Sequence, residues 1–285
     1  MIWRLFCLAL MILGACTGSR RLTRIVQLRT RSRRAMEFAS TAAADPAVPS
    51  EPSAIVSNTA VVKSRMVEAA TRSGRDGTSI RLVAVSKTKP ASDILELYTS
   101  GHRAFGENYF QELLEKAAAL PEDIQWHFIG HLQSQKASKL VRDVKGLYVV
   151  ETVDSLKLAK KLNSACESAE RASLDVYLQV DTSGEDTKSG VPPSETVGLA
   201  QSIAQECPRL RVAGLMTIGA PGDLSAFDRL AELRVDLARA LQVAPDSLAL
   251  SMGMSGDFPE AVARGATSIR VGSTIFGARI YAETR

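Results

Sequence analysis

Several features that mark common protein classes are missing from this chain of 285 residues. Its four cysteines form no CxxC pair and show no metal-site spacing with histidine. The three histidines form no HExxH motif, so no metal site is indicated. Basic residues do not cluster with interleaved aromatics, which argues against nucleic-acid binding. We therefore expect neither a metal ion nor a nucleic acid as a partner.

The sequence also lacks an apolar run long enough to span a bilayer comfortably. Residues 5–15 (LFCLALMILGA) have the length of a signal-peptide core. Residues 20–34 are rich in arginine and free of acids, as in an organelle transit peptide. Two other interpretations stay open: residues 13–16 resemble a bacterial lipoprotein cleavage box, or translation starts at Met36.

The net charge of +4 comes from the first part of the chain. Residues 1–35 hold eight arginines and no acid, which leaves 27 basic and 31 acidic residues, or −4, for the remainder. Residues 40–54 are rich in Ala, Pro and Ser and are typical of a disordered linker. We therefore expect a leader and linker over 1–54 and one folded domain over 55–285. The expected location is cytoplasmic, or mitochondrial or otherwise organellar if the leader is used.

The pattern from residue 55 onward predicts a leading helix over 55–72 and then eight strands that alternate with helices. The predicted strands are 80–86, 102–106, 126–130, 147–151, 174–181, 211–217, 248–252 and 268–272. The predicted helices between them are 91–100, 107–119, 133–144, 154–170, 193–206, 223–242 and 256–264.

This alternation predicts a parallel α/β sheet. The strands are short and mostly apolar, as expected where both faces are covered. Eight repeats favour closure, and no GxGxxG follows the first strand, which argues against a dinucleotide-binding fold. We expect a single (β/α)8 TIM-type barrel with a leading N-terminal helix and no second β domain. Its chemistry should lie at the carboxyl ends of the strands.

Lys87 follows the first predicted strand and is therefore expected at the barrel mouth. Partial desolvation at such a position favours the neutral amine that forms an imine with an aldehyde. An ordinary solvated lysine also fits the position, and Lys89 is a competing candidate.

The end of the last strand resembles an anion site. Gly272 lets backbone N–H groups approach an anion, and a short helix is expected near Ser273. Phosphate sites after strands seven and eight recur in this fold. Arg270 would add charge, and the segment 251–257 supplies small residues, with Ser255 as the expected N-cap of the next helix.

Five other residues draw attention near the predicted strand ends. Asn108 would hydrogen-bond a ring substituent, whereas Glu107 would stabilise a helix start. Met216 would pack on a flat ring or in the core. We expect one of His127 and His131 to be a barrel-core residue.

Six blocks in order resemble the pyridoxal phosphate homeostasis protein family, whose fold is similar to the barrel domain of alanine racemase. They are VAVSKTKP (83–90), FGENYFQE (105–112), WHFIGHLQ (126–133), GLMTIG (214–219), SMGMSGDFPEAV (251–262) and RVGSTIFG (270–277). The resemblance covers residues 55–281 and implies that the chain binds pyridoxal 5′-phosphate (PLP), a form of vitamin B6. It implies a Schiff base on Lys87. The implied phosphate-contacting residues are Ser251, Arg270, Gly272 and Ser273, and the residues near the implied pocket are Asn108, Met216 and Met252.

The resemblance implies a carrier without catalytic residues that holds PLP and supplies it to apo PLP-dependent enzymes, as a monomer or weak dimer. An alternative is a PLP-dependent amino-acid racemase or decarboxylase, and a third is an aldolase that uses Lys87 on a sugar. Racemisation needs a second base, which alanine racemase takes from a second domain. The chain ends thirteen residues after Gly272, so we expect no such domain here.

Removal of residues 1–50 is expected to leave PLP affinity unchanged, because the leader is joined to the barrel by a linker. The measurement is PLP binding by a chain that begins at Glu51, beside the full chain. A large loss of affinity in the shortened chain would assign the leader to the site. A fluorescent protein fused to residues 1–50 tests targeting, and diffuse cytosolic signal would favour a start at Met36.

Overall fold

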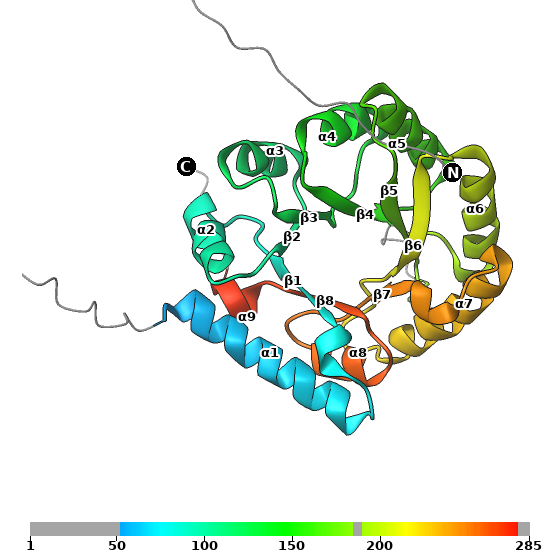
Figure 1. Cartoon of the computed structure of the whole chain (residues 1–285). Coiled ribbons are helices and arrows are strands. Elements are labelled where there is room, and N and C mark those ends of the chain that lie inside the picture. Colours follow the sequence, from blue (N-terminus) through cyan, green and yellow to red (C-terminus); the bar gives the residue numbers. More distant parts are fainter. Residues whose placement is uncertain (1–51, 185–189, 279–285) are drawn as a thin grey trace, which may run out of the picture. The chain divides into compact units, whose positions relative to one another are not determined.

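The computed structural model describes residues 52–184 and 190–278, in which eight parallel strands close into a barrel inside a ring of helices (Figure 1). The strands are β1 (Arg81–Val85), β2 (Ala104–Glu107), β3 (Gln125–Phe128), β4 (Leu147–Val153), β5 (Leu174–Gln179), β6 (Leu210–Met216), β7 (Ala249–Ser251) and β8 (Ser268–Val271). The helices are α1 (Ala54–Arg72), α2 (Ala91–Thr99), α3 (Phe110–Ala119), α4 (Ala137–Asp143), α5 (Leu156–Ser168), α6 (Pro193–Glu206), α7 (Ser225–Leu241), α8 (Phe258–Ala263) and α9 (Ser273–Phe276). Short 3-10 turns occupy Gly77–Ser79, Ser134–Lys136 and Pro245–Ser247. The expected barrel is confirmed.

The barrel closes where β1 pairs with β8 as well as with β2. The register runs from Arg81 opposite Ser268 to Ala84 opposite Val271. The carboxyl end of the first strand therefore lies beside the carboxyl end of the last one.

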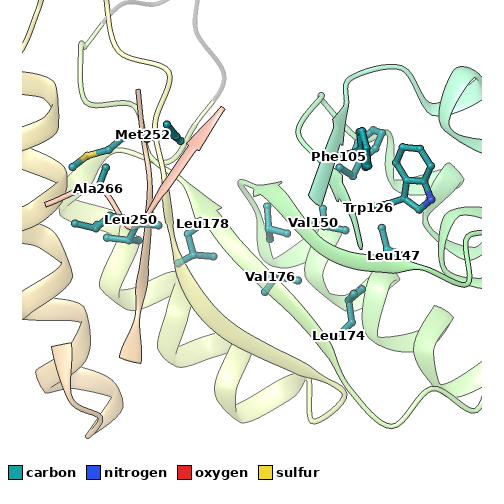
Figure 2. Close-up of a cluster of buried hydrophobic side chains, with 14 of the residues drawn as sticks. Phe105, Trp126, Leu147, Val150, Leu174, Val176, Leu178, Leu250, Met252 and Ala266 are labelled. Carbon is teal, nitrogen blue, oxygen red and sulfur yellow. The ribbon is translucent and has the colours of Figure 1, made fainter. Parts of the chain in front are cut away.

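The main hydrophobic core includes strand side chains and helix side chains such as Leu113 of α3 and Leu230 of α7. Figure 2 shows part of it, with Trp126, Leu147 and Leu174 on three consecutive strands. Large side chains such as these contribute most of the hydrophobic stabilisation.

The interior of the barrel is more polar than this main core, which forms a hydrophobic shell between the strands and the helices. A separate small cluster there contains Val149, Tyr177 and Met216. Buried polar side chains accompany it, among them His127 and Glu151. Because successive strand residues point to opposite faces, the inward positions of these strands form a set distinct from the hydrophobic shell.

The leading helix α1 packs against α8 and α9, as Figure 1 shows. Ser53 is its N-cap and accepts a hydrogen bond from the backbone N–H of Val56 at 3.3 Å. Asn58 on this helix donates to the carbonyl of Ile275 in α9 at 3.2 Å. The predicted helix over 55–72 is confirmed, and it supports the segment that follows β8.

Three predicted boundaries differ from the structure in ways that matter for the site. The helix predicted over 107–119 begins only at Phe110, because Glu107 is the last residue of β2. The strand predicted over 102–106 begins at Ala104. The helix predicted over 133–144 divides into a 3-10 turn and α4. The predicted leader and linker over 1–54 lie almost wholly outside the described residues.

Over residues 52–184 and 190–278, no helix combines the length and apolar character needed to cross a bilayer.

Candidate functional site

A cavity of about 320 Å³ lies at the carboxyl ends of β1, β2, β6 and β8. Six of the eight site residues implied by the resemblance line it: Lys87, Asn108, Met216, Arg270, Gly272 and Ser273. Lys89, Ile129, Met254 and Ser255 are also part of its wall. Strand ends that are far apart in the sequence thus meet at one chamber, as the barrel fold predicts.

Ser251 and Met252 are not part of the cavity wall. Ser251 is fully buried and contacts Arg270 behind the wall, through a hydrogen bond of 2.7 Å. Met252 belongs to the hydrophobic shell. Since it follows an inward-facing residue, the alternation of side chains turns it outward. The structure therefore does not bring Met252 to the predicted pocket.

The loop that carries Lys87 is held at the preceding residue, Ser86. The Ser86 hydroxyl donates to Oε1 of Glu107 at 2.7 Å. The Ser86 carbonyl accepts from Nζ of Lys116 at 2.8 Å. The position of Lys87 therefore depends on β2 and α3 as well as on its own strand.

The loop is held again on the other side of Lys87. Thr88 has a φ of 63°, in the left-handed region that residues with a Cβ rarely adopt. Its backbone N–H donates to Oε1 of Glu112 at 2.6 Å. This contact stabilises a backbone conformation that would otherwise be unfavourable.

Both anchoring carboxylates share one buried ammonium group. Lys116 lies 2.7 Å from Glu107 and 2.6 Å from Glu112, and its side chain is 7% exposed. Burial raises the pKa of the Glu107 carboxyl, and the charge of Lys116 opposes that rise. Oε2 of Glu107 has no hydrogen-bond partner among the described residues. The expectation that Glu107 stabilises a helix start is wrong, because this carboxylate ends β2 and lies in a buried ion cluster.

The segment after β8 lies directly against β1. A Cβ on Gly272 would lie 3.1 Å from the carbonyl oxygen of Val85, so the close approach favours glycine. The Gly272 N–H donates to Oγ of Ser255 at 3.3 Å. Ser255 is not the N-cap of α8 as predicted, because that helix begins at Phe258 and its N-cap position is Asp257. The short helix expected near Ser273 is α9.

Asn108 follows β2 and is fixed by an unusually close backbone contact. A Cβ on Gly130 would lie 1.9 Å from the Asn108 carbonyl oxygen, which is a severe clash. Glycine, which has no Cβ, is therefore required at this position. Oδ1 of Asn108 is buried and has no hydrogen-bond partner in the described part of the chain. A polar ligand in the cavity would satisfy this group, because buried polar atoms are rarely left unpaired.

Arg270 reaches the cavity from inside the barrel and is 4% exposed. Its Nη1 donates to Oγ of Ser251 at 2.7 Å, and its Nη2 donates to the carbonyl of Thr217 at 2.8 Å. Two fixed acceptors thus set the orientation of the guanidinium plane. Burial lowers the pKa of Arg270, and the carboxylate of Glu151 opposes that effect.

Glu151 is the buried counter-charge of this arginine. Ser251 donates its hydroxyl proton to Oε2 of Glu151, which requires β4 and β7 to meet across the barrel interior. His127 Nδ1 lies 2.6 Å from Oε1 of the same carboxylate. Burial alone raises the pKa of Glu151, but the His127 hydrogen bond and the charge of Arg270 outweigh it and hold the pKa below its usual value. The expectation of one barrel-core histidine is confirmed for His127, whereas His131 is exposed.

Sequence reasoning missed the residues that hold the site in place, namely Glu112, Lys116, Gly130 and Glu151. A signal existed for Glu151, a charged residue in the middle of an apolar strand, and for the Glu112–Lys116 pair at helical spacing. No local pattern identifies Gly130, because the contact that requires glycine comes from a different loop.

The fold and this site define a single-barrel protein of the alanine racemase type. A sequence model described as "Alanine racemase, N-terminal domain" matches residues 53–280. The human pyridoxal phosphate homeostasis protein is 50% identical over 238 residues, which covers 78% of this chain and 86% of that protein. The chain belongs to the pyridoxal phosphate homeostasis protein family.

More distant relatives cover the same region. The pyridoxal phosphate homeostasis protein of Escherichia coli is 41% identical and covers 80% of this chain and 98% of its own length. PipY of Synechococcus elongatus, whose structure was solved with PLP bound, has a TM-score of 0.66 and 34% identity. It covers 78% of this chain and all of its own.

Lys116→Met is expected to lower the free energy of unfolding by about 3–5 kcal/mol, because it leaves buried carboxylates without their cation. The measurement is urea unfolding. The double variant Lys116→Met/Glu107→Leu should recover much of the loss, since it also removes the fully buried carboxylate and leaves only the partly exposed Glu112 without its cation. The exposed Lys139→Met is the control and should stay within about 0.5 kcal/mol of the wild type. A Lys116→Met variant as stable as this control would contradict the importance of the cluster.

Proposed function

We propose that this protein binds PLP through Lys87 and acts as a carrier, which buffers the cofactor and supplies it to apo PLP-dependent enzymes. The observation that carries the proposal is the meeting of Lys87, Asn108 and Gly272 in one chamber. A relative solved with PLP bound supports this choice of ligand.

The residues of the chamber fit this cofactor in size and chemistry. A volume of about 320 Å³ suits a ligand of modest size. Gly272 and Ser273 line the chamber at the start of α9, and the first turn of a helix suits a phosphate group. Asn108 offers an unsatisfied buried oxygen to a polar ring substituent. When bound, PLP supplies an aldehyde that an amine such as that of Lys87 captures reversibly as a Schiff base.

The chain's own groups favour holding the cofactor over catalysis. Efficient racemisation needs a positioned acid or base on each face of the substrate, and such a group typically contributes a factor of about 10²–10⁴. Tyr109 is 53% exposed and does not line the chamber. His131 is also exposed, and its Nδ1 lies 3.9 Å from Asp154. Tyr281 also carries a hydroxyl suited to this role, but it lies outside the described residues. These placements support a carrier over the racemase or decarboxylase.

Within residues 52–184 and 190–278, no group of three or more His, Cys, Asp or Glu side chains is arranged to hold a metal ion. We propose that the recipients are apo-enzymes that accept PLP directly, with the carrier acting as a monomer or weak dimer. We propose a cytoplasmic location, or an organellar one for a form that uses its leader.

Borohydride reduction of the PLP-loaded protein, followed by peptide mass analysis, is expected to place a phosphopyridoxyl group on Lys87. Lys89 also lines the chamber, but its Nζ donates to the carbonyl of Ala278 at 2.9 Å. Lys87→Ala should abolish the imine absorbance and retain weak PLP binding, whereas Lys89→Ala should keep the absorbance. An adduct on Lys89, or no adduct, would rule out the assignment.

Holo-protein is expected to restore the activity of an apo PLP enzyme and to show no enzyme-like turnover itself. The measurement incubates it with each standard L-amino acid and follows chirality, CO₂ and keto-acid release. Free PLP at the same concentration is the control. Turnover near or above about 1 s⁻¹, the low end of typical enzyme rates, would instead favour the racemase or decarboxylase.

A further inference from the structure

A second hollow, of about 1040 Å³, lies at the opposite end of the barrel, where the strands begin. It is lined by residues at the amino ends of strands, among them Arg81 of β1, Tyr148 of β4, Arg211 of β6 and Ser268 of β8. None of the residues that line the Lys87 chamber also lines this hollow. It is therefore a separate feature that the proposed function does not use.

Four guanidinium groups line this hollow: those of Arg75, Arg81, Arg211 and Arg234. Three carboxylates accompany them: those of Asp76, Asp175 and Asp246. Positive charge is therefore in excess in the hollow, and the distribution of the carboxylates decides where it is available.

One arginine is fully compensated and a second is not. Arg211 forms two hydrogen bonds with Asp175, of 2.7 and 2.5 Å. Arg81 forms no ion pair with any described residue, in contrast. Its Nη2 donates to the Tyr148 hydroxyl at 2.9 Å, and its guanidinium carbon lies 4.5 Å from the centre of the tyrosine ring. These contacts fix the guanidinium without neutralising its charge.

Arg75 and Arg234 add charge from the rim. Arg75 donates to the backbone carbonyls of Val262 and Ala266, which orient the side chain but carry no net charge. Arg234 has a loose ion pair of 3.7 Å with Asp246, whose side chain is 96% exposed. Nε of Arg234 is buried and lacks a hydrogen-bond partner among described residues. Burial and the positive charge of Arg234 lower the pKa of Arg75, as expected for two cations that share too little negative charge.

Ser268 provides an independent indication of a missing ligand. Its side chain lines the hollow and is 2% exposed, yet Oγ has no hydrogen-bond partner in the described part of the chain. Ser268 lies opposite Arg81 in the β1–β8 register. A hydroxyl donor and an uncompensated guanidinium are thus neighbours on adjacent strands.

We propose that this hollow binds a small, multiply charged oxyanion, which Arg81 and Ser268 contact and to which Arg75 and Arg234 add charge. The ligand class comprises phosphate esters and polycarboxylates, because both present several oxygen acceptors to guanidinium and hydroxyl donors. The site does not depend on the identity of the ligand in the Lys87 chamber.

The test is calorimetric titration of the full chain with inorganic phosphate in one arm and citrate in the other. The salt concentration is about 0.1 M, at which the Debye length is about 10 Å. Each titration is repeated on protein whose Lys87 chamber has been filled with PLP and reduced with borohydride. Saturable binding that persists in the filled protein supports the proposal, and the tighter arm identifies the ligand source. Absence of binding in both arms, or its loss when the chamber is filled, overturns it.

Two variants place the binding in the hollow. Arg81→Gln should weaken it at least about tenfold, as expected for loss of a charged hydrogen bond. Arg142→Gln, at an exposed arginine of α4 outside the hollow, is the matched control and should bind like the wild type. Equal affinities of these two variants would overturn the proposal.

Ser268→Ala separates binding from folding. It removes an unpaired buried hydroxyl, so urea unfolding should show unchanged or higher stability. Oxyanion affinity should nevertheless fall about threefold to tenfold, the usual effect of one hydrogen bond. Unchanged affinity in a stable Ser268→Ala protein would show that the hydroxyl makes no contact and would overturn its assignment.

Discussion

The pairing of β1 with β8 is the constraint on which the rest of the molecule depends. It joins residues about 187 positions apart in the chain, from Arg81 opposite Ser268 to Ala84 opposite Val271. At its carboxyl end it brings the Lys87 loop beside Gly272, so close that a Cβ on Gly272 would lie 3.1 Å from the Val85 carbonyl oxygen. At its amino end the same pairing places Arg81 next to Ser268. An open sheet of the same strands would have neither chamber.

The alternation of side chains along each strand divides this barrel into two environments with different roles. Outward residues such as Trp126 form the hydrophobic shell that stabilises the fold. Inward residues such as His127, Glu151 and Arg270 form a buried hydrogen-bonded network. Such a network contributes little net stability, because desolvation opposes the attraction between charges. Its consequence is geometric, since it fixes the guanidinium that borders the Lys87 chamber.

The sequence was sufficient to predict the barrel, the leading helix and most of the chamber wall. Those features depend on local periodicity and on the rule that parallel strands present their carboxyl ends together. Met252 was expected near the pocket but does not line the chamber. The alternation of side chains along a strand would have indicated this, because a residue next to inward-facing Ser251 faces outward. Glu107 and Lys116 could not be paired from sequence, since their contact depends on how α3 packs on β2. The need for glycine at position 130 could not be predicted either, because the backbone atoms that approach it belong to Asn108 in another loop.

The polar interior also determines how the two ends of the barrel relate. Tyr148, which lines the hollow at the amino ends of the strands, stacks on His127 with ring centres 5.4 Å apart. His127 contacts Glu151, and Ser251 links that carboxylate to Arg270, which lines the Lys87 chamber. These groups fill the space between the two hollows, so the barrel is a packed core and not a channel. The Lys87 chamber is therefore separated from the hollow by this packed interior, and residues that follow β1, β2 and β8 line it. Because Lys87 follows β1 and is half-buried, the proposed Schiff base would lie at the mouth of the barrel, within reach of another protein. That placement suits reversible storage better than enclosure of a reacting substrate.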